Sequence, residues 1–213
     1  MKGFIFDLDG TLLDSLDMWR NIDIEYMARY GITYKDEYGD RIKRLTFREC
    51  AYYFRDELGI DRDIEDILQD WQDMSYHKYK DELELKPYAY EFVKECSKHG
   101  KCMVATSCVL DCATEALKRT GLYEFMDCII TTNEIGSNKE NPKIYYASAE
   151  KLGCAIEDCY VFEDVLSAMK TASDAGFKVI GVHDKKWVHE VDEMKKALHI
   201  LEEGLKAYPG RTL

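Results

Sequence analysis

Two patterns of hydrophobic residues divide the chain. The first consists of short, almost continuously apolar runs, which are typical of strands buried on both faces of a parallel sheet. These runs cover residues 3–6, 101–105, 127–131, 159–162 and 177–182. Stretches with helical periodicity precede or separate the later runs, and a glycine follows each stretch. They cover residues 88–99, 110–120, 142–152 and 165–175. The alternation predicts right-handed βαβ units and a three-layer α/β core around a central parallel sheet.

The second pattern covers residues 15–85, where apolar stripes at helical spacing follow one another without a strand between them. The stripes contain Leu16, Trp19, Ile22 and Tyr26, then Phe47, Ala51, Phe54 and Leu58, then Ile64, Ile67, Leu68, Trp71 and Met74. The glycines expected to separate the helices are Gly31, Gly39 and Gly59. We predict an all-helical domain at 15–85, inserted into an α/β core formed by residues 1–14 and 86–213. A charged helical tail is expected at 187–207.

Charge and composition narrow the class of protein. The 213 residues carry Lys+Arg 29 against Asp+Glu 41, and the net charge of −12 disfavours a general nucleic-acid or anionic-membrane surface. No run approaches the roughly 18 apolar residues of a membrane span. Asp7 and Asp9 interrupt the apolar N-terminus, unlike the pattern of a signal peptide. We expect a cytoplasmic protein, a monomer or weak homodimer, that binds neither nucleic acid nor membrane.

The cysteines and histidines show no pattern of a metal site. The 8 cysteines contain no C-x-x-C pair, and the 5 histidines have no ligand spacing. A disulfide framework is also unexpected, because a chain of this size can stabilise itself by burial. Several cysteines stand within apolar runs, as Cys102 does, and are interpreted as small buried hydrophobic residues. Cys108, which stands close to a motif described below, is the cysteine whose reactivity we single out for testing.

The strongest candidate chemistry follows the first apolar run. Asp7 and Asp9 stand two residues apart, so the alternation along a strand places their carboxylates on the same side. They emerge at the carboxyl end of a strand, where open α/β sheets build their sites, and Gly10 permits a sharp exit. Two like charges this close need a cation or a shared proton, and Mg²⁺ suits a sparse carboxylate site that also holds a phosphate. The alternative is a turn that is merely acidic.

Three later segments carry groups that complement these carboxylates. Thr106 and Ser107 follow the second run and offer hydroxyls to a phosphoryl oxygen. Lys139 stands just before a predicted helix start, where a cation and backbone N–H groups attract an anion. Glu163 and Asp164 end the fourth run with a second pair of carboxylates. Each segment alone is as typical of a solvated loop, but together they predict a magnesium and phosphate site.

The ordered set of Asp7-Leu8-Asp9-Gly10-Thr11, Thr106, Lys139 and Glu163-Asp164 resembles the four motifs of the haloacid dehalogenase-like hydrolase superfamily. The helical insert directly after the first motif resembles the cap of its beta-phosphoglucomutase/phosphoglycolate phosphatase branch. The similarity extends over nearly the whole chain to about Val182. It implies a three-layer Rossmann-like core with a central parallel sheet plus an inserted all-helical cap domain.

The resemblance also implies roles for individual residues. Asp7 is the implied nucleophile, which takes the phosphoryl group as an aspartyl-phosphate. Asp9 is implied to protonate the leaving oxygen and then to deprotonate the attacking water. The groups implied to surround Mg²⁺ are the Asp7 side chain, the Asp9 backbone carbonyl, Glu163 and Asp164. The groups implied to hold the phosphoryl oxygens are Thr106, Ser107 and Lys139.

The predicted function is a Mg²⁺-dependent phosphatase that hydrolyses a small phosphorylated metabolite, such as a sugar phosphate or a phosphoglycolate-like acid. A beta-phosphoglucomutase-like mutase uses the same core residues and stays the alternative. Three other functions fit the sequence less well. A haloalkanoic acid dehalogenase lacks a counterpart of Asp9, and a phosphonate hydrolase would need a lysine from the cap, for which Lys43 is a candidate. A phospho-accepting receiver module carries its phosphorylated aspartate on a later strand. Lys43 and Arg48 are the cap candidates for gripping a second anionic group, against the alternative of a solvated helix face.

Overall fold

The computed structural model describes residues 1–42, 45 and 47–182. These residues form two compact units, of which one is Asp17–Glu82. The other combines Met1–Leu16 with the chain from Leu83 onward. The helical tail expected at 187–207 lies outside the described residues. No helix in the described part of the chain is both long and apolar enough to cross a bilayer.

The larger unit contains a five-stranded sheet whose strands all pair in parallel. The strands are β1 Lys2–Phe6, β2 Gly100–Thr106, β3 Cys128–Thr131, β4 Cys159–Glu163 and β5 Lys178–Gly181. Their spatial order is β3-β2-β1-β4-β5, so β1 is central and Phe6 lies opposite both Val104 and Phe162. Every apolar run that predicted a strand contains one, and the parallel α/β core is confirmed.

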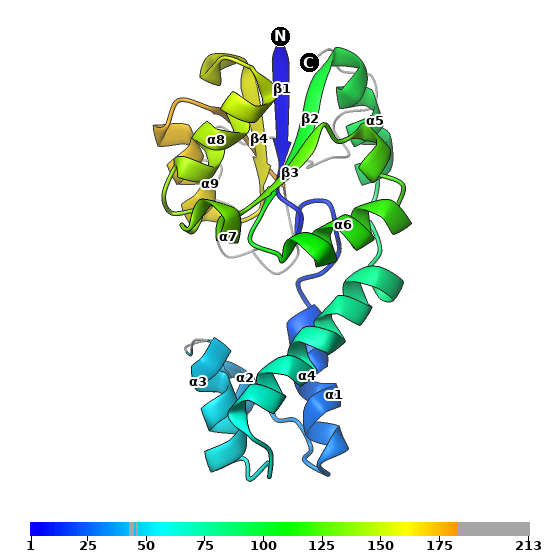
Figure 1. Cartoon of the computed structure of the whole chain (residues 1–213), viewed down its shortest axis with the longest axis vertical. Coiled ribbons are helices and arrows are strands. Elements are labelled where there is room, and N and C mark those ends of the chain that lie inside the picture. The colour runs from blue at the N-terminus through cyan, green and yellow to red at the C-terminus, as the bar shows by residue number, and fades with distance from the viewer. Residues whose placement is uncertain (43–44, 46, 183–213) are drawn as a thin grey trace. The chain divides into compact units, whose positions relative to one another are not determined.

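Helices cover both faces of this sheet, which makes the three layers (Figure 1). They are α5 Ala89–His99, α6 Leu110–Arg119, α7 Thr132–Ile135, α8 Lys143–Leu152 and α9 Leu166–Asp174, with 3₁₀ turns at Tyr123–Phe125 and Ile156–Asp158. On one face, Ile5 and Val161 pack in a buried cluster with Tyr145 of α8. On the opposite face, Phe6 and Phe162 stack at 4.7 Å between ring centroids, and other aromatic contacts come from α5. The alternation along each strand therefore feeds two apolar layers.

The glycines that end the helices behave as expected at three of four positions. Gly121, Gly153 and Gly176 have φ values of 75°, 65° and 93°, the left-handed region that glycine tolerates best. Gly100 is the exception, because its φ of 178° is ordinary extended backbone and it already belongs to β2. A side chain there would overlap the backbone of Lys2 on the neighbouring strand, so close strand approach is the reason for this glycine.

The smaller unit is helical throughout its described residues. Its elements are α1 Met18–Arg29, α2 Asp36–Ile42, α3 Phe47–Tyr52, a π-helical turn at Tyr53–Glu57, α4 Ile64–His77 and a π-helical turn at Lys78–Glu82. Its core contains Tyr26, Phe54 and Trp71, whose rings contact one another at 4.9–6.2 Å between centroids. The Tyr26 hydroxyl donates a 2.9 Å hydrogen bond to Asp70, which fixes its orientation at the edge of this core.

Three details of the helical unit differ from the expectation. Gly39 does not separate helices but lies within α2, where the Tyr34 hydroxyl occupies the space of a side chain. Trp19 and Phe47 belong to the predicted core stripes, yet they are 44% and 42% exposed and contact each other edge to face. Helical spacing assigns a residue only to a broad apolar face of its helix, and a residue at the edge of that face can remain partly exposed.

Candidate active site

The carboxyl ends of β1 and β4 bring three carboxylates together. Asp7 directly follows β1, and its backbone N–H donates a 2.9 Å hydrogen bond to the carbonyl of Phe162. Glu163 is the last residue of β4, and Asp164 follows it. All three carboxylate residues are 7% exposed or less. Parallel pairing of β1 with β4 thus places residues that are far apart in sequence at one edge of the sheet.

Lys139 links two of these carboxylates. It lies in the connection between α7 and α8, and its Nζ donates to Asp7 Oδ1 and to Glu163 Oε1. Its side chain is 11% exposed, so both ion pairs are shielded from water. Shielded charges interact more strongly than exposed ones, and a buried cation needs such partners. The loop that was expected to carry an anion-binding lysine therefore delivers this lysine to the carboxylate pair.

Burial and neighbouring charges shift the pKa values of Glu163 and Lys139. Burial raises the pKa of the Glu163 carboxyl to about 7, against the opposing charge of Lys139. Burial lowers the pKa of the Lys139 ammonium, but the charges of Asp7 and Glu163 outweigh it and raise that pKa above its usual value. The second Glu163 oxygen accepts the N–H groups of Asp164 and Val165 at 3.2 and 3.4 Å. Glu163 is thus fixed on both of its oxygens.

The carboxylates form a donor set that fits a small divalent cation. One oxygen each from Asp7, Glu163 and Asp164 lies within 4.8 Å of the other two. The set contains only hard oxygen donors, which Mg²⁺ prefers, and no sulfur or imidazole. Gly10 contributes by its missing side chain, because a Cβ at its position would overlap the Asp164 carboxylate. The residues present therefore fit Mg²⁺.

The other residues expected at the site occupy less enclosed positions, except for Thr106. Thr106 is fully buried at the end of β2, and its Oγ1 accepts the backbone N–H of Cys108 at 2.9 Å. Ser107 is exposed, and Asp9 is partly exposed in the turn after β1. The cluster of three carboxylates contains Asp7, Glu163 and Asp164 and does not include the Asp9 carboxylate. Thr11 is fully buried, but its hydroxyl has no hydrogen-bond partner among the described residues.

The two cap candidates belong to the helical unit and not to the unit that contains the carboxylate cluster. Lys43 lies outside the described residues. Arg48 lies in α3 and donates two hydrogen bonds to the carboxylate of Glu65, at 2.6 and 3.2 Å. The Arg48 side chain is more than half exposed, so this ion pair is a surface pair of small net value.

Tyr145 is a neighbour of the site that the sequence patterns did not reveal. Its ring belongs to the core beneath α8, and its hydroxyl lies 3.4 Å from Glu163 Oε1 and 3.4 Å from the carbonyl of Ala168. Burial raises the pKa of this phenol above its ordinary range, so the group stays protonated. A tyrosine at a core position of a helix carries no local signal of such a role.

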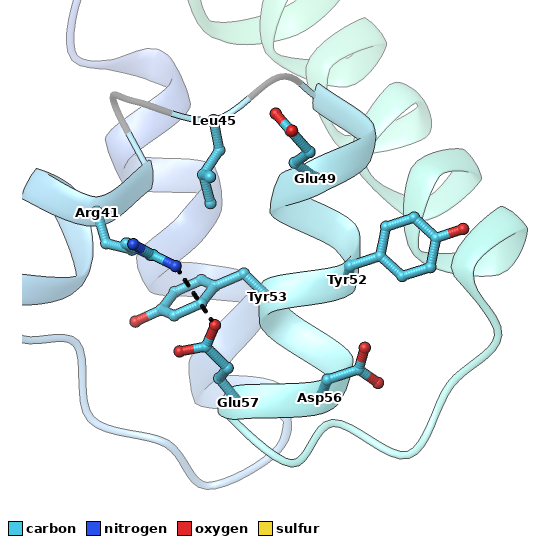
Figure 2. A pocket seen from close by; sticks show the side chains of 7 residues that line it. All are labelled: Arg41, Leu45, Glu49, Tyr52, Tyr53, Asp56 and Glu57. Carbon is cyan, nitrogen blue, oxygen red and sulfur yellow. Dashed lines mark ion pairs between the residues drawn. The ribbon is translucent and has the colours of Figure 1, made fainter.

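The helical unit contains a shallow pocket of about 150 Å³ between α2 and α3, shown in Figure 2. Carboxylates dominate its polar lining, namely those of Glu49, Asp56 and Glu57. The Arg41 guanidinium in this pocket already pairs with Glu57 at 3.7 Å. Ligand pockets usually measure about 300–1,000 Å³, and net negative charge repels phosphate esters. This pocket is therefore a poor candidate for an anionic substrate.

Comparison with known proteins identifies a family whose sequence pattern this chain matches, together with similar phosphatases. The family model for haloacid dehalogenase-like hydrolases matches residues 4–182. A Thermotoga maritima protein named phosphorylated carbohydrates phosphatase is 29% identical over 202 residues, covering 93% of this chain and 90% of that protein. Hexitol phosphatase A of Escherichia coli is 24% identical over 205 residues, covering 95% and 92%.

A solved structure shows the same architecture. The crystal structure of a putative beta-phosphoglucomutase from Thermotoga maritima matches with a TM-score of 0.83 and 26% identity, covering 95% of this chain and 94% of that one. These matches confirm the predicted superfamily, its beta-phosphoglucomutase-like branch and the α/β fold, and they support the expected class of phosphoric monoester hydrolase. Because the family model matches most of the chain, this protein belongs to the haloacid dehalogenase-like hydrolase family.

Proposed function

We propose that this protein is a Mg²⁺-dependent phosphatase that hydrolyses a small phosphorylated metabolite through an aspartyl-phosphate on Asp7. The observation that carries this proposal is the cluster at the ends of β1 and β4. Lys139 pairs there with both Asp7 and Glu163, and Asp164 completes a set of three oxygen donors. A metal-assisted displacement on phosphorus needs this combination of a carboxylate nucleophile, a cation site and a lysine.

In the first half of the reaction, an Asp7 carboxylate oxygen forms a bond to phosphorus while the bond to the leaving oxygen breaks. Asp9 donates a proton to the leaving oxygen, so the alcohol departs neutral. In the second half, Asp9 takes a proton from water, and the water oxygen attacks the phosphorus of the aspartyl-phosphate. Phosphate leaves and the Asp7 carboxylate is restored. Two easier displacements thus replace one difficult step.

The remaining residues of the cluster position the groups and balance their charges. Asp7, Glu163, Asp164 and the Asp9 backbone carbonyl would hold Mg²⁺, which when bound supplies positive charge next to the phosphoryl oxygens. Lys139 offsets further charge on those oxygens. Thr106 can donate its hydroxyl proton to a phosphoryl oxygen, because its Oγ1 already accepts from the Cys108 N–H.

The proposed substrates are monophosphates of sugars or sugar alcohols, with phosphoglycolate-like acids as a second group. Support comes from relatives that are named as phosphatases of phosphorylated carbohydrates and of hexitols. The helical unit would act as a cap that excludes water, and Lys43 and Arg48 would contact a distal anionic group of the substrate. Such contacts would require Arg48 to exchange its Glu65 partner for substrate. We propose a monomer or weak homodimer in the cytoplasm.

Phosphate release from a panel of sugar, sugar-alcohol and small-acid monophosphates tests the proposal. Asp7→Asn should reduce turnover to background while the fold persists, because the change is nearly isosteric. Chelation should stop activity and Mg²⁺ should restore it. Asp14→Asn, at an exposed aspartate of the same segment, is the matched control and should keep its activity. Substantial turnover by Asp7→Asn, or full activity after removal of divalent metal, would contradict the proposed mechanism.

A sugar-phosphate mutase is the second candidate, favoured by the likeness to the beta-phosphoglucomutase structure. A mutase would also phosphorylate Asp7, but a second hydroxyl of the sugar phosphate would then attack instead of water. We expect net phosphate release and no efficient interconversion of hexose 1- and 6-phosphates. Rapid interconversion primed by a hexose bisphosphate, with little free phosphate, would favour the mutase.

A further inference from the structure

The Tyr145 hydroxyl is a buried hydrogen-bond donor that the proposed mechanism does not use. Tyr145 lies in the first turn of α8 and is 1% exposed. Its hydroxyl oxygen lies 3.4 Å from Glu163 Oε1 and 3.4 Å from the carbonyl oxygen of Ala168. This side chain therefore joins α8 to the end of β4, where the carboxylate cluster lies.

The start of α8 holds this tyrosine in place. The Asn141 side chain accepts the backbone N–H of Lys143 at 3.1 Å. The Pro142 carbonyl accepts the backbone N–H of Tyr145 at 3.0 Å. The Tyr145 ring also contacts Phe177 in the buried cluster, at 6.0 Å between centroids. A closely packed ring has few alternative positions, so its hydroxyl stays beside the same two acceptors.

The two acceptors compete for the single proton of the hydroxyl, which can serve only one of them at a time. The Ala168 carbonyl is neutral and belongs to α9, where helical bonding already uses part of its acceptor capacity. The Glu163 carboxylate is charged in its ion pair with Lys139. Hydrogen bonds to charged acceptors are roughly twice as strong as those between neutral groups, so the proton is directed at Glu163.

The other partners of Glu163 make this donor important. Its Oε2 accepts the backbone N–H groups of Asp164 and Val165, and its Oε1 accepts from Lys139. Each carboxylate oxygen can accept two hydrogen bonds, so Oε1 has room for Tyr145 beside Lys139. Lys139 has a long, flexible side chain and is also proposed to offset charge on the phosphoryl oxygens. Tyr145 is then the donor that remains on Oε1.

The length of this contact fits a group that acts in the complex with ligands. The usual distance for a hydroxyl donor is about 2.7–2.8 Å, so a contact of 3.4 Å contributes little to the stability of the fold. Active-site hydrogen bonds are often long in a free enzyme and shorten when the substrate binds. We therefore expect the effect of the Tyr145 hydroxyl in metal binding rather than in folding.

We propose that Tyr145 is a positioning residue that holds the Glu163 carboxylate, through a hydrogen bond to Oε1, in the orientation in which it binds Mg²⁺. This role rests on the metal site of the proposed function and not on the identity of the substrate. Hydrogen bonds that orient a metal-binding carboxylate are typically worth about 10–100-fold in metal affinity or activity. Three other donors also hold Glu163, so we expect the lower value, about tenfold.

Two adjacent tyrosines offer a matched pair of variants. Tyr145→Phe removes the hydroxyl and keeps the ring, so the packing of α8 should persist. Tyr146→Phe makes the same chemical change one residue away, where the ring also contacts Phe177 at 6.0 Å but the residue is 43% exposed. Urea unfolding without divalent metal should show one cooperative transition for both variants.

Calorimetric titration of the full chain with Mg²⁺ alone measures the effect on the site without any substrate. We expect the Kd for Mg²⁺ to be about tenfold higher for Tyr145→Phe than for the wild type, and within twofold of the wild type for Tyr146→Phe. In phosphate-release assays, the Mg²⁺ concentration for half-maximal rate should rise by the same factor for Tyr145→Phe. Its KM for the phosphate monoester should stay within twofold, because the donors to the phosphoryl oxygens are unchanged.

The outcomes separate this role from packing and from the proposed function. A Kd for Tyr145→Phe within twofold of the wild type, whatever its urea midpoint, shows a packing role only and overturns the proposal. A KM that rises more than the Mg²⁺ requirement also overturns it, since Tyr145 would then act on the phosphoryl donors. If the Kd shifts as expected but the wild type hydrolyses no monophosphate, the role of Tyr145 stands and the proposed function is contradicted. A wild type that does not bind Mg²⁺ contradicts the metal site and this role together.

Discussion

Replacing Gly10 by alanine tests whether the turn after β1 must lack a side chain for the carboxylate cluster to form. Gly10 has a φ of 80°, and a Cβ there would lie 2.8 Å from the carboxyl carbon of Asp164 and 3.0 Å from a methyl group of Leu16. Gly153→Ala is the matched control in the same unit. Its φ is 65°, but no atom lies within 4 Å of the added carbon.

The two substitutions share one energetic cost and differ in another. Left-handed backbone costs an L-residue about 1–2 kcal/mol, partly offset by about 0.4–1 kcal/mol of reduced chain entropy in the unfolded state. Gly153→Ala should therefore lower the free energy of unfolding by about 1 kcal/mol and leave activity unchanged. Ordinary contact begins near 3.4 Å, and the Asp164 Oδ2 atom would lie even closer to the added carbon than the carboxyl carbon does. Gly10→Ala must therefore also displace the Asp164 carboxylate by more than about 0.6 Å. Because Asp164 is a proposed metal-binding group, displacement on this scale is expected to lower kcat/KM by about 10²-fold.

Urea unfolding and phosphate-release kinetics over a Mg²⁺ titration separate these effects. We expect Gly10→Ala to lose more stability than the control and to need a higher Mg²⁺ concentration for half-maximal rate. If kcat/KM of Gly10→Ala at saturating Mg²⁺ lies within threefold of the control, then the position of Asp164 does not depend on Gly10. The steric explanation of this glycine would then be wrong.

Three further predictions follow from other parts of the molecule. Phe162→Ala removes a fully buried ring that stacks on Phe6, and should lower the free energy of unfolding by about 3–5 kcal/mol in urea titrations. Burial raises the pKa of Asp23 from 3.8 to about 7, so the folded protein retains a proton that the unfolded chain has released. Stability should fall between about pH 4 and pH 7 by up to about 1.4 kcal/mol per pH unit from this group, and Asp23→Asn should remove that slope in unfolding experiments. If the two cap cations contact substrate, Lys43→Ala combined with Arg48→Ala should raise KM more than it lowers kcat, because the contacts are remote from phosphorus; an unchanged KM would argue for a solvated helix face.

The sheet could be predicted because its strands are mostly apolar: β1, β2 and β4 are largely buried, and the edge strands β3 and β5 are partly buried. Such strands appear as continuous apolar runs, and each of the five runs contains a strand within two residues of its expected ends. The candidate site followed from the same logic, since parallel strands end at one edge and polar residues after them must meet there. Asp7 and Glu163 follow apolar runs and Lys139 stands before a predicted helix, and these positions predicted the proximity that the ion pairs of Lys139 show.

The features that the sequence did not predict depend on tertiary contacts, which no local pattern of residues encodes. Tyr145 has the apolar spacing of a core residue, and only the packing of α8 on the sheet brings its hydroxyl to Glu163. The sequence suggests that Gly39 ends a helix, but the structure shows that the Tyr34 hydroxyl occupies the space where a side chain would be. The exposure of Trp19 and Phe47 likewise depends on how neighbouring helices pack.

The central position of β1 has a consequence for the order in which the protein is made. This strand is synthesised first, yet it is bonded on one side to β2 and on the other to β4, where Gly3 lies opposite Cys159. The nascent chain must therefore keep one edge of this largely buried strand unpaired through most of translation. Unpaired strand edges favour incorrect association with other chains. The Asp7 carboxylate, which is the proposed nucleophile, also gains its partners Lys139 and Glu163 only after these later residues have been synthesised. The proposed activity therefore depends on residues made late in translation.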